Sequence, residues 1–140
     1  ETIGRNIEVE DTLAMHLKWK NGAIGTMAVT MLTYPENLEG SITILGEKGS
    51  VRLGGKAVNN FEIWEFDSQS EDDLIVKNSN YPYESVYGSG HPVFYEEMIK
   101  NLRGNESNIC NGNEGLKSLE IIIAAYESAK SLQRVYLPLL

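Results

Sequence analysis

The stretch best suited to chemistry is Tyr-Gly-Ser-Gly-His at residues 87–91, which precedes a helical pattern. Glycines in front of a helix let a backbone approach a phosphate, as in the dinucleotide-binding Gly-x-Gly-x-x-Gly turn. Here the third glycine is missing, Phe94 stands one place beyond its position, and no parallel strand precedes the motif. We therefore interpret the stretch as a turn and a helix entry.

The two histidines, His16 and His91, are the next candidates. Neither has a neighbour at metal-ligand spacing, so no metal site is expected. His16 stands among apolar residues of a predicted strand, and we interpret it as packed or interfacial. His91 lies beside Gly90 and Pro92 at a loop-to-helix junction, where functional side chains often occur. A role as helix N-cap explains His91 equally well.

Carboxylates and nucleophiles add little. Glu96 and Glu97 are adjacent, so on a helix they point about 100° apart and form no converging acid/base pair. A solvated helix face is the better interpretation of both. No serine or cysteine nucleophile has a companion base nearby in sequence. Tyr34 and Tyr95 are candidate ligand contacts, but the residues alone identify no catalytic group.

Composition limits the partners. The 140 residues carry a net charge of −8, so nucleic acids and anionic membranes, which repel an acidic protein, are not expected partners. No apolar run approaches the length needed to span a bilayer. Cys110 is the only cysteine, which excludes an internal disulfide and favours a reducing, cytoplasmic compartment. Because the chain begins at Glu1 rather than Met, we expect a processed product or a piece of something longer.

Residues 12–33 predict a β-hairpin around Asn21-Gly22, the pair that best tolerates positive φ in a type I′ turn. If that pair is the loop, Trp19 pairs with Ile24. Large apolar side chains then occupy both faces, whereas a half-exposed strand pair is apolar on one side only. We therefore expect both faces to be covered. One face would carry Leu13, Met15, Leu17 and Trp19, and the other Met27, Val29 and Met31.

More strands are predicted before residue 80. Residues 41–45 and 50–53 flank a loop with glycine at each end and predict a second hairpin. Residues 61–66 predict another apolar strand, and residues 67–73 a solvated loop. Residues 74–76 read as a short edge strand. In the strand at 61–66, strict alternation would put Phe61 and Ile63 on one side and Trp64 and Phe66 on the other.

The apolar spacing becomes helical from Pro92, which suits a first helical position, and Gly104 suits the position just past the helix end. A second helix is predicted to begin near Asn111 or Asn113, either of which can cap it. Residues 135–139 are predicted to add a last edge strand. Residues 1–10 form a lead-in.

Strands followed by helices predict an α+β domain with a mainly antiparallel, open-faced sheet. Two helices cover only one face of such a sheet. The other apolar face must meet something else, and a second copy of the chain is the simplest candidate, which predicts a homo-oligomer.

The order of these motifs is itself informative. Residues 9–53 contain an Asp-Thr before the first strand, the Asn-Gly turn, a Tyr-Pro after the second strand and a Gly-x-x-Gly hairpin. Residues 88–105 and 111–139 contain a Gly-His leading one helix and a Tyr-Glu-Ser-Ala segment late in the next. In this order and spacing the chain resembles the C-terminal domain of the Gfo/Idh/MocA family, which includes glucose-fructose oxidoreductase and inositol dehydrogenase, with the weakest likeness at residues 67–87.

The resemblance implies a single domain over residues 1–140 with a free sheet face that builds dimers or tetramers. It implies that a Rossmann domain binding NAD or NADP, with the catalytic residues, would precede Glu1, so that this chain holds no catalytic, cofactor or metal residue. Its His-Pro-x-x-Tyr form resembles the branch that oxidises nucleotide-linked N-acetylated sugar uronates. The positions it places on the substrate side are Tyr34, Gly90, His91 and Tyr95.

The leading hypothesis is therefore the substrate-binding and oligomerisation domain of an NAD(P)-dependent sugar dehydrogenase, inactive by itself, with a sugar or nucleotide sugar as the substrate of the whole enzyme. The rival hypothesis is a non-enzymatic oligomerisation or ligand-sensing module.

Overall fold

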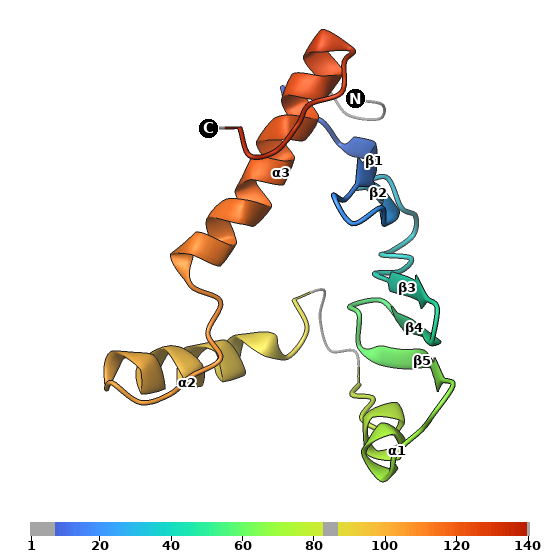
Figure 1. The fold of residues 1–140 in the computed structure, drawn as a ribbon, viewed down its shortest axis with the longest axis vertical. Coiled ribbons are helices and arrows are strands. Elements are labelled where there is room, and N and C mark those ends of the chain that lie inside the picture. Colours follow the sequence, from blue (N-terminus) through green and yellow to red (C-terminus); the bar gives the residue numbers. More distant parts are fainter. Residues whose placement is uncertain (1–7, 83–86, 140) are drawn as a thin grey trace. The chain divides into compact units, whose positions relative to one another are not determined.

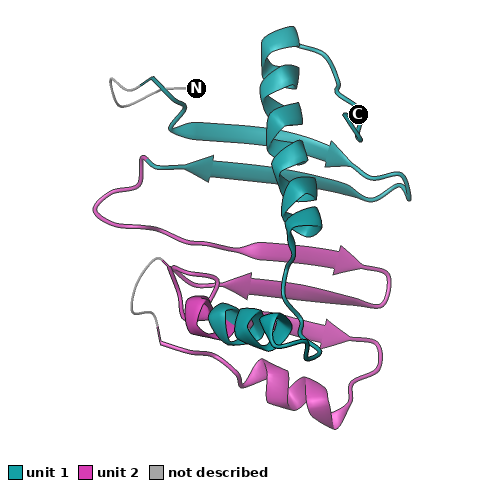
Figure 2. Cartoon of the chain, turned by 90° about the vertical axis from the view of Figure 1, so that its left-hand side faces the viewer, with its two compact units in different colours: residues 1–31, 94–140 teal, residues 32–93 magenta. Residues whose placement is uncertain are grey.

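The computed structural model describes residues 8–82 and 87–139 and has an α+β fold (Figure 1). The chain divides into two compact units, unit 1 with residues 1–31 and 94–140 and unit 2 with residues 32–93 (Figure 2). All strand pairs in the described residues are antiparallel, as predicted. Residues 1–7 of the expected lead-in lie outside the description. The elements are β1 (Thr12–Lys18), β2 (Ile24–Thr30), β3 (Ile42–Gly46), β4 (Gly49–Gly54), β5 (Asn60–Phe66), α1 (Glu71–Lys77), α2 (Gly90–Leu102) and α3 (Gly112–Ser131).

In unit 1, β1 and β2 form the predicted hairpin, but the predicted register is wrong by one residue. Lys18 pairs with Ile24 rather than Trp19. The Trp19 N–H donates to the Ala23 carbonyl at 2.9 Å and the Gly22 N–H to the Trp19 carbonyl at 3.0 Å. Gly22 takes a φ of +96°. The loop is therefore longer than Asn-Gly alone, with the positive φ at its glycine.

With this register most large apolar side chains lie on one face of the hairpin and the polar ones on the other. A slip of one residue moves every side chain of one strand to the other face, which explains the difference from the prediction. The expectation of large apolar groups on both faces is therefore wrong for this strand pair. Ile24 is the large exception on the second face, at 79% exposed. The first face carries Leu13, Met15, Leu17, Met27 and Val29, and the second carries Thr12, Ala14, His16, Lys18, Thr26, Ala28 and Thr30.

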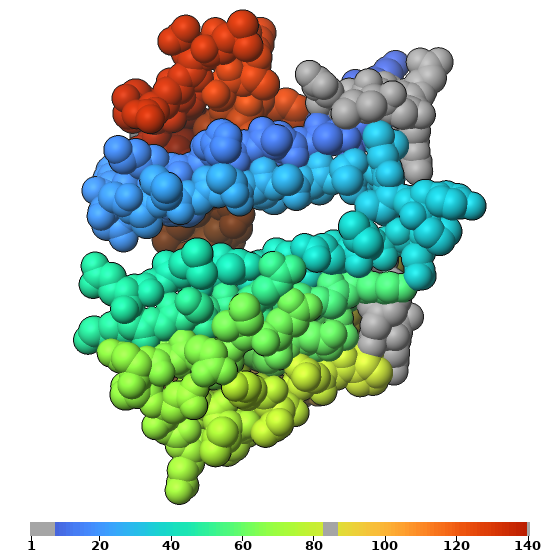
Figure 3. All heavy atoms as spheres, turned by 90° about the vertical axis from the view of Figure 1, so that its right-hand side faces the viewer, coloured from blue at the N-terminus to red at the C-terminus, as the bar shows by residue number. Residues whose placement is uncertain are grey.

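The apolar face of the hairpin lies toward α3. The side chains of the two elements line an open hollow of about 440 Å³, and Figure 3 shows the hairpin in blue from its opposite side. Tyr126 of α3 donates a hydrogen bond to the Glu10 carboxylate, which lowers the pKa of Glu10. The residues lining the hollow include Leu13, Met15, Met27, Val29 and Met31 from the hairpin side and Ser118, Ile121, Ile122 and Ala125 from α3.

Helix α3 begins where the sequence predicts. The Asn111 side chain accepts the N–H groups of Asn113 and Glu114 at 3.0 and 3.2 Å, which caps the helix. After α3 the chain turns back along the helix, and the Leu139 N–H donates to the Glu120 carboxylate at 2.6 Å (Figure 1). The prediction of a strand at residues 135–139 is wrong, because the tail bonds to helix side chains rather than to a strand.

In unit 2 the strands form one sheet in the order β3-β4-β5, and the second predicted hairpin is confirmed. A bulge between Arg52 and Leu53 shifts the pairing with β5, so that Phe61 joins the face of Trp64 and Phe66. The expected separation of Phe61 from these rings is therefore wrong. The Phe61 and Trp64 rings meet edge-to-face at 5.6 Å, and those of Trp64 and Phe66 at 5.3 Å.

The predicted edge strand at residues 74–76 is wrong, because these residues lie in α1. Ser70 and Asp73 form a capping box at its start, a spacing that the sequence displays. The Trp64 indole also donates to Asp73 at 2.9 Å. The Ser70 N–H, with Trp64 and the Ser70 hydroxyl, lowers the pKa of Asp73. Part of the predicted acidic loop is therefore a helix start that holds α1 against β5.

No helix in the described residues combines the length and the apolar character needed to cross a membrane.

The register of β1 and β2 gives a matched pair of substitutions. Met27→Glu places a charge in the apolar hollow under α3 and should lower the free energy of unfolding by about 1–3 kcal/mol. Ala28→Glu, on the opposite face, should change it by no more than about 0.5 kcal/mol. Urea unfolding followed by circular dichroism measures both. Equal losses in the two variants would contradict the observed register.

Candidate functional site

The most enclosed part of the chain is the turn between β4 and β5. Residues 49–61 include no exposed position, although connecting segments usually run over the surface. Asn59 is only 5% exposed. A turn with so little exposure has to satisfy most of its backbone polar groups within the chain, so its hydrogen bonds determine its shape.

The Asn59 side chain uses both ends of its amide. Its Oδ1 accepts the Ala57 N–H at 3.3 Å, and its Nδ2 donates to the Tyr81 carbonyl at 2.8 Å and to Asn60 Oδ1 at 3.1 Å. The Asn59 carbonyl also accepts the Tyr81 N–H at 3.3 Å. These contacts hold the turn against the segment around Tyr81.

The same turn has an unusual backbone. Val58 takes a φ of +56°, a conformation that is an outlier for a β-branched residue. Gly55 has a φ of +86°, and a Cβ there would lie 2.4 Å from Asn59 Oδ1. The turn therefore has a strained residue and a glycine that no other residue type can replace without displacing Asn59.

The loop that carries Tyr34 is attached to this turn. Asn37 Nδ2 donates to the Lys56 carbonyl at 2.7 Å, and the Gly40 N–H donates to the Gly55 carbonyl at 2.8 Å. Glu36 also pairs with the Lys56 ammonium group. The Tyr34 side chain itself is 95% exposed. Its backbone is thus anchored within three residues while its ring is free to meet a ligand.

The entry to α2 meets the turn from another direction. A Cβ at Gly88 would lie 3.9 Å from the Ala57 carbonyl oxygen and 3.8 Å from the Tyr81 hydroxyl. The Tyr87 and His91 rings meet edge-to-face at 6.2 Å. Helix α2 begins at Gly90, so His91 is a helical residue and its interpretation as N-cap is wrong.

The other positions of α2 differ in part from expectation. Pro92 is the third helical residue rather than the first, which a helix tolerates because the first turn has no acceptors for its N–H groups. The helix ends at Leu102, and Gly104 follows with a φ of +76°, as predicted. Tyr95 is exposed and follows His91 by four residues, a spacing that places side chains on one side of a helix.

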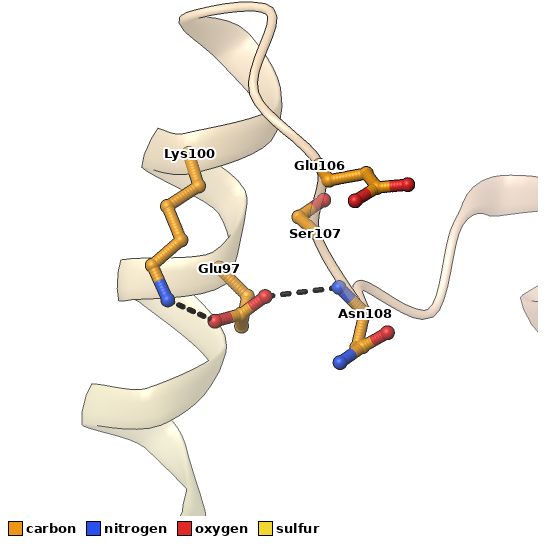
Figure 4. A pocket seen from close by; sticks show the side chains of 5 residues that line it. All are labelled: Glu97, Lys100, Glu106, Ser107 and Asn108. Atoms are coloured by element: carbon orange, nitrogen blue, oxygen red, sulfur yellow. Dashed lines mark hydrogen bonds and ion pairs between the residues drawn. The ribbon is translucent and has the colours of Figure 1, made fainter.

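A second hollow, polar and of about 480 Å³, lies beside the C-terminal half of α2 (Figure 4). Glu97 accepts hydrogen bonds from Lys100 and from the Asn108 N–H, and these two contacts lower the pKa of Glu97. The interpretation of Glu97 as merely solvated is therefore wrong. It attaches the loop after α2 to the helix, and each of its two carboxylate oxygens accepts one of these bonds.

The residues of the turn before α2 do not fit a dinucleotide. A phosphate binds where glycine backbone N–H groups are open to it. Beside Gly88, an added Cβ would stand 3.9 Å from the Ala57 carbonyl oxygen, so one side of this glycine is occupied by a backbone acceptor. The strand pairs around it are antiparallel in the described part of unit 2, whereas a dinucleotide fold needs parallel strands. Residues 8–82 and 87–139 also contain no cluster of three His, Cys, Asp or Glu side chains that could hold a metal ion.

The model of the C-terminal alpha/beta domain of the Gfo/Idh/MocA oxidoreductase family matches residues 3–137. The chain belongs to this family. The resemblance seen in the motifs of the hairpins and the closing helices is thereby confirmed.

Two solved structures of the Gfo/Idh/MocA type are similar to the whole chain. The WlbA dehydrogenase from Bordetella pertussis in complex with NADH and UDP-GlcNAcA is 51% identical with a TM-score of 0.92, and the match covers 100% of this chain and 40% of that one. The WlbA dehydrogenase from Chromobacterium violaceum, in complex with the same two molecules, is 54% identical with a TM-score of 0.87, covering 100% and 39%. The chain thus spans about two fifths of the length of these dehydrogenases. Among curated proteins none matches.

The turn around Asn59 is the part of the site that sequence reasoning missed. The sequence shows Gly54-Gly55 and Asn59-Asn60 at its two ends, which indicates a turn. Nothing in that pattern reveals that the Asn59 amide is buried, since its partner Tyr81 is far away in sequence.

The conformation of Val58 gives a direct test. Glycine has no Cβ penalty at positive φ. The free energy of unfolding of Val58→Gly should therefore be about 1 kcal/mol larger than that of Val58→Ala, so the glycine variant is the more stable. Both variants lose the same two valine methyl groups, so their difference isolates the Cβ and the backbone. Urea unfolding of the two variants measures it. The usual order, with alanine the more stable, would show that residue 58 does not hold this φ.

Proposed function

We propose that this chain is the substrate-side domain of a nicotinamide-dependent dehydrogenase that oxidises a UDP-linked N-acetylhexosaminuronate. The observation that carries the proposal is the 51% and 54% identity, over the whole chain, to two WlbA dehydrogenases solved with NADH and UDP-GlcNAcA. At such identity, structure and substrate class are commonly shared. The reaction class is oxidation of a sugar CH–OH to a carbonyl, with a hydride passing to the nicotinamide and a proton to a general base.

We further propose that the dinucleotide and the catalytic base belong to a part of the enzyme outside this chain. In support, the glycine-rich turn before α2 does not fit a dinucleotide, and the chain corresponds to about two fifths of the WlbA length. By itself, the chain should neither bind NADH nor turn over substrate.

The groups offered to the substrate are those at Tyr34, Gly90, His91 and Tyr95. A UDP-sugar uronate carries a diphosphate and a carboxylate, and the net charge of −8 disfavours such an anion in general. Binding therefore needs local donors. The first turn of α2 contains no acidic residue, and a Cβ at Gly90 would meet no atom within 4 Å. His91 and the tyrosine hydroxyls supply further donors, and the rings supply flat surfaces for a sugar.

We also propose that the chain oligomerises through its open sheet, with β3 rather than β1 and β2 as the surface involved. The corrected register removes the argument from the two faces of β1 and β2. What supports it now is β3, where Ile42 and Ile44 share one face and are 53% and 61% exposed. A second copy of the chain would cover them.

Activity of the complete protein that contains this chain tests the proposal. With NAD⁺ and UDP-GlcNAcA we expect NADH to form, followed by absorbance at 340 nm, while UDP-GlcNAc, which lacks the carboxylate, should react far more slowly. NADP⁺ is assayed in parallel, because the chain does not distinguish the two cofactors. No NAD(P)H from any UDP-hexosaminuronate would overturn the proposed function.

Substituting His91 tests the site. His91→Ala removes a donor to a charged substrate and should raise the KM for UDP-GlcNAcA by about 10–100-fold. The KM for NAD⁺ should stay within about twofold, because the dinucleotide binds elsewhere. His16→Ala, the other histidine, is the matched control and should change neither value. A His91 variant with an unaltered KM for the sugar would remove His91 from the substrate side.

A further inference from the structure

We propose that Asn59 is a positioning residue for the substrate side of this domain, fixing the turn that anchors the Tyr34 loop and adjoins the entry to α2. The proposal rests on the proposed function for its consequence in binding. Its structural basis consists of contacts within residues 32–93, which hold whatever the domain binds.

The first step is the burial of the Asn59 amide. At 5% exposure it cannot exchange its partners for water. Its Oδ1 and Nδ2 bridge the Ala57 N–H within the turn and the Tyr81 carbonyl outside it. Removing either end leaves a buried polar group without a partner, so the amide is fixed in one orientation and the turn with it.

The second step is the strain of the turn. A positive φ at Val58 persists only where surrounding contacts determine it. The Asn59 bridge on one side of Val58 and the hydrogen bond from the Gly40 N–H to the Gly55 carbonyl on the other supply such contacts. The turn is therefore held in one conformation by contacts that a local sequence preference would not provide.

The third step is the connection to the candidate site. The Lys56 carbonyl of the turn accepts the Asn37 amide, and the neighbouring Ala57 carbonyl lies near Gly88, where an added Cβ would stand 3.9 Å from its oxygen. A shift of the turn would therefore move the Tyr34 loop and change the space beside the α2 entry. Binding geometries fail with displacements on the order of 1 Å, so such a shift is enough to weaken substrate binding.

The decisive variant is Asn59→Asp in the complete protein. The carboxylate has nearly the same shape but cannot donate to the Tyr81 carbonyl or to Asn60. We expect faster backbone hydrogen exchange at residues 34–40 and 87–91, with α1 unchanged. We also expect a KM for UDP-GlcNAcA raised about tenfold with the KM for NAD⁺ unchanged. Asn78→Asp is the matched control, because it makes the same change at an exposed residue of unit 2 and should leave both segments and the KM values as they are.

Hydrogen exchange separates the two proposals, since it needs no turnover. Faster exchange at both segments in a protein that does not oxidise UDP-GlcNAcA would support the positioning role and overturn the proposed function. Unchanged exchange at either segment, or equal rises in the KM for sugar and for NAD⁺, would overturn the positioning role. If Asn59→Asp does not fold, Asn59→Ser removes the bridge without burying a charge, and the same readings apply.

Discussion

An enclosed loop must satisfy its own polar groups, and unit 2 depends on how the turn between β4 and β5 meets that constraint. One amide, that of Asn59, supplies an acceptor to the turn and two donors to its surroundings. Because these bonds are shielded from water, the geometry of the turn is passed on to the segments that bond to it. The exposed Tyr34 ring therefore belongs to a loop whose backbone is bonded to this turn.

The second constraint is that successive side chains of a strand point to opposite faces of the sheet. Each sheet meets this constraint in a different way. In unit 1 a loop longer than Asn-Gly brings Leu13 and Met27 to the same face, toward α3. In unit 2 a bulge does the corresponding task by moving Phe61 beside Trp64. In both cases one irregular position brings several large apolar side chains to one face, with Ile24 in unit 1 and Ile63 in unit 2 left on the other.

Much of the fold followed from local signals. Asn111 as a cap, Gly104 as a stop and the Gly46-to-Gly49 loop each act within a few residues, so the sequence displays them. The register of β1 and β2 was missed because Asn-Gly suits two loop lengths, although segregating the apolar residues would have favoured the longer one. Helix α1 was missed although Ser70 and Asp73 have capping-box spacing. For the site, the sequence indicated which positions to consider but not how they are arranged in space. That the turn around Asn59 anchors the Tyr34 loop and lies beside the α2 entry depends on the packing of distant segments, which no local pattern contains.

The returning C-terminal tail has a mechanical consequence. After α3 the chain doubles back, tied at one end by the Ser128 hydroxyl to the Gln133 carbonyl and at the other by the Leu139 N–H to Glu120. Tension applied at the last residues would break these two hydrogen bonds one after the other. Only then would force reach the helix backbone. The tail thus shields α3 from pulling at that end of the chain, and the Glu120 contact would be the first to break.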